Sequence, residues 1–261
     1  MAVASSETRF PTTPSLRLDG RKALVTGASK GLGRAIAIAF AEAGADVLLT
    51  ARSLPEMEAT VAHLKGRGLS ARALALDVTD SDAVRALVSA EGPFDVLLNN
   101  AGTNIREPFL EVPDTSLDTL LDLNVRAAFV VGQAVAQGMV AAKKRGAIVN
   151  LSSVNGHVAG TNRSVYTATK FAFEGMTKAM AVELGPHGIR VNAICPTFIE
   201  TPLTAGVLSD EAFMARTLRA IPLGRIGQVE DVMGAAVFLA SDAAGLINGA
   251  SLLIDGGMTC V

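Results

Sequence analysis

The sequence is poor in several residue types that other classes of protein depend on. Only two of its 261 residues are cysteine, Cys195 and Cys260, and their separation fits neither a disulfide framework nor a metal-binding motif. This count is typical of a reducing compartment. The formal net charge is −2, whereas a general nucleic-acid-binding protein would carry a strong basic excess. We therefore expect a cytoplasmic protein without a nucleic-acid partner.

Long apolar runs are also missing. No run approaches the length that a membrane span needs, so we expect no membrane partner. The first fifteen residues, MAVASSETRFPTTPS, are polar, contain two prolines and lack the apolar segment of a secretory signal. We expect residues 1–19 to form a flexible tail and residues 20–261 to form a single domain.

The three histidines, His63, His157 and His187, are too scattered along the chain to predict a metal site. We therefore expect no bound metal. His63 and His187 are expected on the surface near helix ends. His157 lies in the segment between Ser153 and Tyr166 and is either an ordinary loop histidine or a residue that touches substrate.

Short apolar runs alternate with longer helical patterns along the whole chain. Nearly half of the residues are hydrophobic, enough for a large core. Continuous apolar runs are typical of strands buried on both faces of a parallel sheet, and they lie at 22–27, 46–51, 71–76, 94–99, 147–152, 189–194 and 250–255. Crossover helices are expected, for example, at 32–43, 55–66, 115–143, 165–185 and 229–240, with Gly44 as a C-terminal cap. The pattern predicts an α/β fold, a single-domain Rossmann-type doubly wound parallel sheet with helices on both faces.

A glycine-rich segment, TGASKGLG, follows the first expected strand. Gly27, Gly31 and Gly33 fall at a strand-to-helix turn, where the absence of side chains lets backbone N–H groups and the helix N-terminus face a diphosphate. An ordinary glycine-rich turn would look similar in isolation. Its place in the first βαβ unit predicts a dinucleotide site.

The end of the second expected strand indicates which dinucleotide binds. An acid near this point usually contacts the ribose 2′-hydroxyl, and an arginine suits a 2′-phosphate. Here Ala51 occupies the acid position and is followed by Arg52, while Lys30 lies in the glycine loop. Either cation alone could be a solvated surface charge. Together they predict NADP(H).

The only tyrosine of the chain, Tyr166, lies four residues before Lys170. On a helix these two residues share a face, and an ammonium group near a phenol favours the phenolate, which makes the tyrosine a usable acid and base. Ser153 follows the fifth expected strand, at the sheet edge where α/β folds bind ligands, and could hydrogen-bond a reacting carbonyl oxygen.

In combination these motifs resemble the short-chain dehydrogenase/reductase family, from about Arg21 to Gly257. The resemblance rests on their order along the chain: Thr26-Gly27-x-x-x-Gly31-x-Gly33, Asp77-Val78, Asn99-Asn100-Ala101-Gly102, Asn124, Ser153, Tyr166-x-x-x-Lys170 and Ile199-x-Thr201. Members similar to this chain include 3-oxoacyl-ACP reductases and gluconate 5-dehydrogenases. The resemblance implies an oxidoreductase whose nicotinamide carries a hydride and whose tyrosine donates or accepts the proton.

The resemblance also implies roles for individual residues. The expected catalytic residues are Asn124, Ser153, Tyr166 and Lys170, with Asn124 holding the water that links Lys170 to solvent. The expected cofactor-binding residues are Gly27, Ser29, Lys30, Gly31, Leu32, Gly33, Arg52, Asp77, Val78, Asn100, Ala101, Gly102, Tyr166, Lys170, Pro196, Ile199 and Thr201. One position departs from the family pattern: Thr197 follows Pro196 where members commonly have glycine, which would narrow the loop over the nicotinamide.

Polar loops give one indication of the substrate. Asn104, Asn155, His157 and Arg163 are candidate substrate contacts, and Asn162 and Arg106 lie in the same loops. If they line the pocket, the substrate is polar and could carry a carboxylate, because arginine suits such a group. Loops are often polar without binding anything. Segment 197–221 is expected to include a lid over the substrate, with helical apolar spacing from residue 201.

Lys143, Lys144 and Arg145 end the long helix expected at 115–143. Cations suit a helix C-terminus, which is sufficient reason for them. Family members that reduce acyl-carrier-protein substrates use basic residues near this helix end, and a second basic group where this chain has His187. That mismatch weakens the carrier-protein interpretation.

Small residues at helical spacing, Ala168, Ala172, Gly175, Met176 and Ala179, permit close helix packing in the segment 165–185. By resemblance this helix and the preceding long one pair across a subunit interface, and the ending INGASLLIDGG resembles a strand of a second interface. A homotetramer, or else a dimer, is expected. A face buried within one chain would give the same pattern.

The sequence thus predicts an NADP(H)-dependent enzyme that interconverts a ketone and a secondary alcohol of a small molecule. The first expectation for its substrate is a 3-oxoacyl thioester, and the alternative is a sugar acid or another small polar hydroxy compound. A non-catalytic dinucleotide-binding regulator has the same fold but would be expected to lack one of the four catalytic residues, all of which are present.

Overall fold

Seven parallel strands form one sheet in the order β3-β2-β1-β4-β5-β6-β7. The structure is a computed structural model and describes residues 10–260. The strands are β1 (Lys22–Thr26), β2 (Asp46–Ala51), β3 (Ala71–Ala75), β4 (Val96–Asn99), β5 (Gly146–Leu151), β6 (Ile189–Pro196) and β7 (Ser251–Ile254). Each lies within two residues of its predicted bounds, because runs of buried apolar residues end where the sheet ends.

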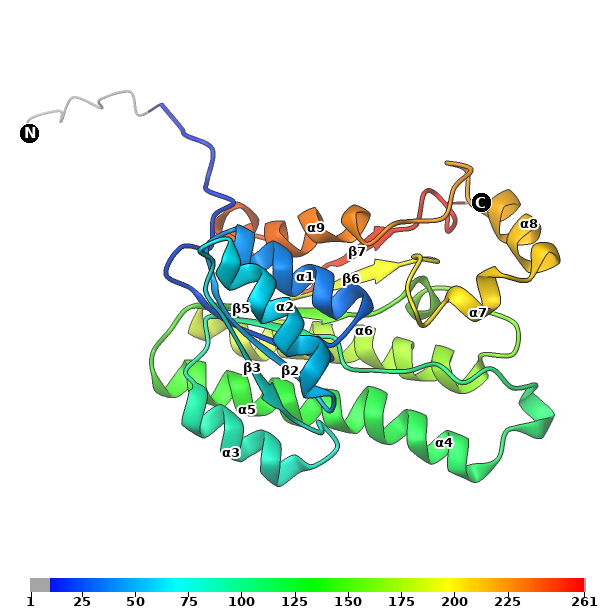
Figure 1. The fold of residues 1–261 in the computed structure, drawn as a ribbon, viewed down its shortest axis with the longest axis horizontal. Coiled ribbons are helices and arrows are strands. Elements are labelled where there is room, and N and C mark those ends of the chain that lie inside the picture. Colours follow the sequence, from blue (N-terminus) through cyan, green and yellow to red (C-terminus); the bar gives the residue numbers. More distant parts are fainter. Residues whose placement is uncertain (1–9, 261) are drawn as a thin grey trace, which may run out of the picture.

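Helices cover both faces of the sheet (Figure 1). The helices are α1 (Gly31–Glu42), α2 (Leu54–Gly66), α3 (Ser81–Glu91), α4 (Asp114–Leu121), α5 (Ala128–Ala141), α6 (Ser164–Leu184), α7 (Ala205–Leu208), α8 (Glu211–Ala220) and α9 (Glu230–Ala240). Helices α1, α2 and α9 pack in one apolar cluster with the sheet, and α3, α5 and α6 pack in the other. The predicted Rossmann-type α/β fold is confirmed.

The strand order reverses between β1 and β4. From β1 the chain adds strands outward to β3, and from β4 it adds them in the opposite direction to β7. Loops that leave adjacent strands on either side of such a reversal diverge and open a crevice at the carboxyl edge of the sheet. The glycine segment after β1 and the Asn-Asn-Ala-Gly segment after β4 meet at this crevice.

The packed part of the chain begins before residue 20. Leu18 is fully buried, and its backbone N–H donates to the carbonyl oxygen of Ala43 at 2.8 Å. Arg17 donates to the carbonyl oxygen of Glu42 at 3.0 Å. Residues 1–9 of the predicted flexible tail lie outside the described residues. Gly44 follows α1 with a φ of +105°, as predicted for a residue that ends a helix.

Helices α4 and α5 are joined by a π-helical turn, η2 (Asp122–Ala127), into one continuous helix, Asp114–Ala141. This helix is long enough to cross a membrane, and the mean hydropathy of its most apolar window is 1.2. However, 56% of that window is buried inside the protein, as in a core helix.

Candidate active site

The glycine segment between β1 and α1 has the backbone geometry of a ligand-binding loop. Gly27 and Gly31 have φ values of +65° and +57°, which residues with a side chain rarely adopt. A Cβ on Gly27 would lie 2.8 Å from the Asn100 amide nitrogen, and a Cβ on Gly33 would overlap that nitrogen and the carbonyl oxygen of Gly27. Glycine is therefore required at both positions for the loop to close against the segment after β4.

Thr26 and Asn100 tie the two crevice loops together. The buried Thr26 hydroxyl accepts hydrogen bonds from the backbone N–H groups of Asn100 and Ala101 at 3.0 and 3.1 Å. The Asn100 amide donates back to the carbonyl oxygens of Thr26 and Gly27 at 2.8 and 3.1 Å. The loops therefore form one rigid edge beside the N-terminus of α1.

The first turn of α1 is available to an anion. Lys30 is its N-cap residue and makes no capping hydrogen bond with its side chain. A cleft of about 400 Å³ adjoins this turn, lined by Gly31, Arg34, Ala35, Ile38, Glu200, Thr201, Pro202, Val229, Glu230 and Met233. The helix N-terminus and the glycine backbone suit a diphosphate here, so the residues fit a dinucleotide.

The end of β2 has the composition predicted for a 2′-phosphate site. Ala51 is buried, while Arg52 and Lys30 are exposed. Asp77, just after β3, has a pKa below its ordinary value, because Thr79 donates two hydrogen bonds to its carboxylate and Arg52 adds a nearby positive charge. A carboxylate therefore lies near Arg52 at this corner, although Ala51 itself is not an acid.

Asn124 lies in the π-helical turn η2 and is almost fully buried. Its side-chain oxygen accepts from the backbone N–H of Thr103 at 2.9 Å, and its amide donates to the Thr103 carbonyl at 2.9 Å and to the Thr169 hydroxyl at 3.2 Å. Thr169 in turn donates to the Tyr166 carbonyl oxygen at 2.7 Å. Asn124 thus couples the loop after β4 to the helix that carries Tyr166. Such π-turns occur frequently at functional sites.

Ser153 and Tyr166 meet at the carboxyl edge of β5. Ser153 is buried, follows β5, and accepts from the Asn155 backbone N–H at 3.1 Å. Tyr166 lies in the first turn of α6 and is half-buried. Its pKa is raised above the ordinary value because burial penalises the phenolate, although the Ser153 hydroxyl and the positive charge of Arg163 act in the opposite direction.

Lys170 lies one turn further along α6 and is 7% exposed. Its ammonium nitrogen donates to the Leu151 carbonyl at 2.8 Å and lies 5.6 Å from the centre of the Tyr166 ring. Burial lowers its pKa to about 8, while Cys195 and Glu174 raise it. We expected Lys170 to lower the pKa of the phenol. Here burial dominates at both residues, and the charge that opposes it at Tyr166 belongs to Arg163.

Comparisons with known proteins agree with this geometry. Residues 27–259 match the sequence model of a family described as enoyl-(acyl carrier protein) reductase. The chain is 42% identical over 246 residues to gluconate 5-dehydrogenase of Gluconobacter oxydans, covering 93% of this chain and 96% of that protein. It is 42% identical over 244 residues to D-erythrulose reductase of Gallus gallus, covering 94% and 98%.

A comparison with solved structures gives the same family. The crystal structure of a gluconate 5-dehydrogenase from Burkholderia cenocepacia, in complex with NADP and tartrate, superposes with a TM-score of 0.90 at 36% identity, covering 94% of this chain and 98% of that chain. The chain belongs to the short-chain dehydrogenase/reductase family. It is an oxidoreductase that acts on CH–OH donors and uses a nicotinamide dinucleotide.

Two neighbouring arginines lie near the catalytic segment, and one of them, Arg163, acts electrostatically on Tyr166. Arg163, the N-cap residue of α6, lies over the ring of Phe198 at 4.9 Å, and Arg106 lies over the ring of Phe213 at 5.0 Å. The two rings pack edge to face with centroids 5.3 Å apart. Burial lowers the pKa of Arg163, and so does the positive charge of Arg106. Two like charges are therefore held close together, and the charge of Arg163 acts on Tyr166.

The other predicted substrate residues are split between two places. Asn155 joins the arginine group, because its side-chain oxygen accepts from Arg163 at 3.4 Å. The side-chain oxygen of Asn104 is buried without a hydrogen-bond partner among the described residues, and so is Nε of Arg163. His157 instead turns toward Glu174, with its Nε2 3.7 Å from the carboxylate.

The predicted lid contains the short helices α7 and α8. Thr201 lies over the glycine loop, since a Cβ on Gly31 would be 3.6 Å from it. Thr204 holds this turn by donating to the Ile199 carbonyl at 2.6 Å. Thr197, the departure from the family pattern, donates from its hydroxyl to the Met258 sulfur at 2.9 Å. The side chain that glycine would lack therefore contacts the C-terminal segment.

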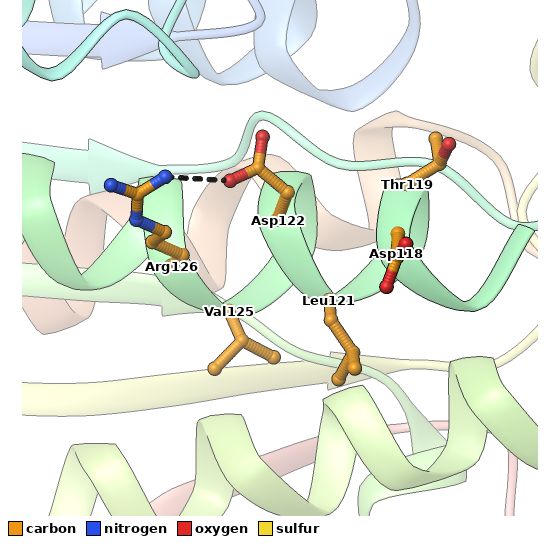
Figure 2. A pocket seen from close by; sticks show the side chains of 6 residues that line it. All are labelled: Asp118, Thr119, Leu121, Asp122, Val125 and Arg126. Carbon is orange, nitrogen blue, oxygen red and sulfur yellow. Dashed lines mark hydrogen bonds and ion pairs between the residues drawn. The ribbon is translucent and has the colours of Figure 1, made fainter. Parts of the chain in front are cut away.

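A second hollow lies on the surface of α4 and η2, and no residue of the predicted lid lines it. It has a volume of about 710 Å³ and is lined by Asp118, Thr119, Leu121, Asp122, Val125 and Arg126 (Figure 2). Figure 2 shows Leu121 and Val125 on one edge of the helix and the Asp122–Arg126 ion pair, 3.3 Å long, on the other. None of the candidate catalytic residues lines it, so it is not part of the reaction site.

Sequence reasoning missed the buried group that His157 joins. Glu174, one turn beyond Lys170 on α6, is 6% exposed and accepts hydrogen bonds from the Cys195 thiol at 3.3 Å and from the Ser251 hydroxyl. The four-residue spacing from Lys170 to Glu174 was a usable signal, because it places the carboxylate on the helix face that carries Tyr166 and Lys170.

Proposed function

We propose that this reductase interconverts a ketone and a secondary alcohol on a sugar acid, with NADP(H) as cofactor. The observation that carries the proposal is the pair of neighbouring arginines, Arg106 and Arg163, of which Arg163 acts on Tyr166. Among residues 10–260, neither Arg106 nor Arg163 forms an ion pair with a carboxylate. Two neighbouring guanidinium groups without an acidic partner favour an anionic substrate, because guanidinium binds carboxylate with paired hydrogen bonds.

The positions of these groups suit a substrate with its charge at one end. Arg163 is partly buried, and its Nε lacks a partner in the part of the chain that the structure describes. An unpaired buried donor is costly, so a ligand that accepts from it gains that free energy on binding. A carboxylate placed between Arg163 and Arg106 would direct the rest of a short chain of hydroxyl-bearing carbons toward Tyr166.

The candidate catalytic residues then have distinct tasks. The nicotinamide, when bound, supplies or accepts the hydride. In the direction of ketone reduction, the Tyr166 hydroxyl donates its proton to the carbonyl oxygen, and the Ser153 hydroxyl hydrogen-bonds the same oxygen as negative charge develops. Lys170 and Asn124 then support return of a proton to the phenolate. In alcohol oxidation the phenolate accepts the hydroxyl proton instead.

Arg52 and Lys30 favour NADP(H) over NAD(H). Both are exposed cations at the corner where β2 ends beside the glycine loop, and the buried Ala51 takes the place of an acid. The Burkholderia cenocepacia gluconate 5-dehydrogenase, a relative by fold and sequence, was crystallised with NADP. We assign the 2′-phosphate to Arg52 and Lys30, with Asp77 and Val78 beside the adenine.

The comparisons favour this alternative over the 3-oxoacyl thioester that we expected first. The relatives of known activity named above act on a sugar acid and on a sugar. Of the three cations proposed for carrier-protein docking, Lys144 is held in an ion pair with Asp95 at 2.7 Å. A neutral ketose remains the competing substrate, because the D-erythrulose reductase is as similar to this chain as the gluconate 5-dehydrogenase.

We also propose that the chain forms a homo-oligomer through α4, α5 and α6. Of the small residues on α6, Ala168, Ala172, Gly175 and Ala179 are exposed, so a face buried within one chain does not account for them. Phe129 on α5 is 50% exposed and Phe171 on α6 is 48% exposed. Exposed aromatic and small residues on adjoining helices suit close packing against a second copy. A tetramer would need a second interface, for which β7 is the candidate.

The test compares charged and uncharged substrates in matched variants. NADPH oxidation is measured with a 5-keto sugar acid, a neutral ketose and an acetoacetyl thioester. Replacing Arg163 with glutamine should lower kcat/KM for the keto acid by about 10- to 100-fold, the effect of losing a hydrogen bond to a charged group. The matched control is Arg216→Gln, because Arg216 also lies over Phe213, at 5.2 Å, but is exposed on α8.

The ratio of kcat/KM for the keto acid to kcat/KM for the neutral ketose decides the proposal. Arg163→Gln should leave the neutral ketose nearly unaffected, and Arg216→Gln should leave both substrates unaffected. An equal loss for both substrates would make Arg163 structural, and a preference of the unaltered enzyme for the neutral ketose or the thioester would overturn the sugar-acid assignment.

A further inference from the structure

Three side chains of metal-binding type meet behind the catalytic helix. They come from different elements: His157 from the loop after η3 (Val154–Gly156), Glu174 from α6 and Cys195 from β6. His157 Nε2 is 3.7 Å from one oxygen of Glu174, and the Cys195 sulfur is 3.3 Å from the other. The three ligand atoms all lie within 4.8 Å of one another.

The ligand set is selective for a class of metal. One imidazole nitrogen, one carboxylate oxygen and one thiolate sulfur are the donors of zinc sites, and hard cations such as Mg²⁺ avoid sulfur. Bonds of about 2.0–2.3 Å to a central ion require these atoms to lie roughly 3.5 Å apart, so the 4.8 Å spread needs a shift of about 1 Å. The His157 side chain is 32% exposed and lies on a loop, so it can make that movement.

The surroundings are closely packed and contain a further polar atom. Gly156 packs so closely on Glu174 that a Cβ there would lie 2.8 Å from its Cγ. The same Cβ would lie 3.1 Å from the hydroxyl of Ser152, a residue only 4% exposed whose hydroxyl hydrogen-bonds the Cys195 sulfur and so favours its thiolate. A buried hydroxyl beside the sulfur can orient and stabilise a thiolate ligand.

We propose that His157, Glu174 and Cys195 form a binding site for a Zn²⁺-class divalent cation, with the fourth position open to water from the His157 side. When the ion binds, the S–H bond of Cys195 breaks, a sulfur–metal bond forms, and the proton leaves to solvent. Glu174 gives up the hydrogen bond from the thiol and gains the metal. The carboxylate and thiolate together neutralise the charge of the ion. The site lies beside Lys170, whose pKa Cys195 and Glu174 raise, but the proposal does not depend on the identity of the substrate.

The test uses a Cys260→Ser background, because Cys260 is an exposed free thiol that would bind metals adventitiously. Zn²⁺ is titrated into this protein in competition with a chromophoric chelator, and Co²⁺ is added to a second sample. We expect one tightly bound Zn²⁺ per chain and a thiolate-to-metal charge-transfer band with Co²⁺. His157→Gln and Cys195→Ser should each lose the bound ion, and Cys195→Ser should lose the band.

His187→Gln is the matched control, because His187 is exposed at the end of α6 and far from Cys195 in the fold. It should bind Zn²⁺ as the background protein does. Circular dichroism of each metal-free variant shows whether it has folded, and Glu174→Gln, which keeps the side-chain size, replaces any variant that has not. No tight Zn²⁺ in the background protein, or Zn²⁺ retained by folded His157→Gln and Glu174→Gln, would overturn the proposal.

Discussion

Replacing Lys170 with methionine should abolish turnover and at the same time stabilise the fold. The pKa of Lys170 falls from 10.5 to about 8 in the folded protein, because burial penalises its charge. A difference of one in pKa corresponds to about 1.4 kcal/mol, so the buried ammonium costs about 3 kcal/mol of stability at neutral pH. Methionine removes this cost but leaves the Leu151 carbonyl without its donor, which costs about 1 kcal/mol. The net gain in the free energy of unfolding is about 2 kcal/mol.

This gain should depend on pH in a defined direction. The folded pKa lies below the unfolded value, so between about 8 and 10.5 the unfolded chain binds more protons at this residue and the unaltered protein becomes more stable as the pH rises. The advantage of Lys170→Met is therefore complete below pH 8 and is lost as the pH approaches 10.5.

Urea unfolding followed by circular dichroism measures both proteins at pH 7 and at pH 10, at one protein concentration because oligomers gain stability by mass action. Lys178→Met is the matched control, since Lys178 is exposed two turns further along α6 and should change little at either pH. If Lys170→Met is less stable than the unaltered protein at pH 7, or if the difference stays constant between the two pH values, the reasoning about burial is wrong.

Three further variants test the cofactor loops. Gly33→Ala places a methyl group against Asn100 and should abolish dinucleotide binding and destabilise the fold by about 1–3 kcal/mol. Gly234→Ala, in open space on α9, should do neither. Calorimetry with NADPH measures binding and thermal unfolding measures stability, and a Gly33→Ala protein that binds NADPH normally would contradict the role given to the loop. Arg52→Gln should weaken NADPH binding by about tenfold and leave NADH binding unchanged, and an equal loss for both cofactors would remove the 2′-phosphate assignment. Thr26→Val leaves two backbone N–H groups without their acceptor and should lower the free energy of unfolding by about 2–3 kcal/mol in chemical denaturation. A change below about 0.5 kcal/mol would show that the hydrogen bonds between the two loops are unimportant for stability.

The sheet could be predicted from the sequence nearly residue by residue. Runs such as ALVT and VLL are apolar on both faces, and only a covered parallel sheet buries both faces of a strand. The glycine loop could be predicted as well, because Gly27 and Gly31 adopt backbone angles that other residues avoid. The Tyr166–Lys170 spacing is local, and local spacing is what a sequence displays directly.

Contacts between distant segments could not be predicted in this way. Asn124 lies in a π-turn and hydrogen-bonds Thr103, twenty-one residues away, and no helical pattern reveals either feature. The pairing of Arg163 with Phe198 and of Arg106 with Phe213 depends on how the lid packs over the crevice. Likewise, the direction of the pKa shift at Tyr166 follows from burial, which the spacing of Tyr166 and Lys170 does not show.

The position of His157 in the fold changes the role that its position in the sequence suggests. In the sequence it is one of three scattered histidines, in a loop expected beside the substrate. In the fold it lies against Glu174, whose other oxygen accepts from Cys195. These residues are separated by seventeen and twenty-one positions along the chain, so only the packing of the loop, α6 and β6 brings them together.

The central claim is that Tyr166 transfers the proton while a nicotinamide carries the hydride to or from a sugar acid. The measurement that tests it most directly is single-turnover oxidation of NADPH by a 5-keto sugar acid, with the unaltered protein and with Tyr166→Phe. The account predicts turnover by the unaltered protein and a loss of at least about 10²-fold in the variant, with NADPH binding retained. A Tyr166→Phe protein that reduces the keto acid at the unaltered rate, or an unaltered protein that binds NADPH and reduces no carbonyl, would contradict it.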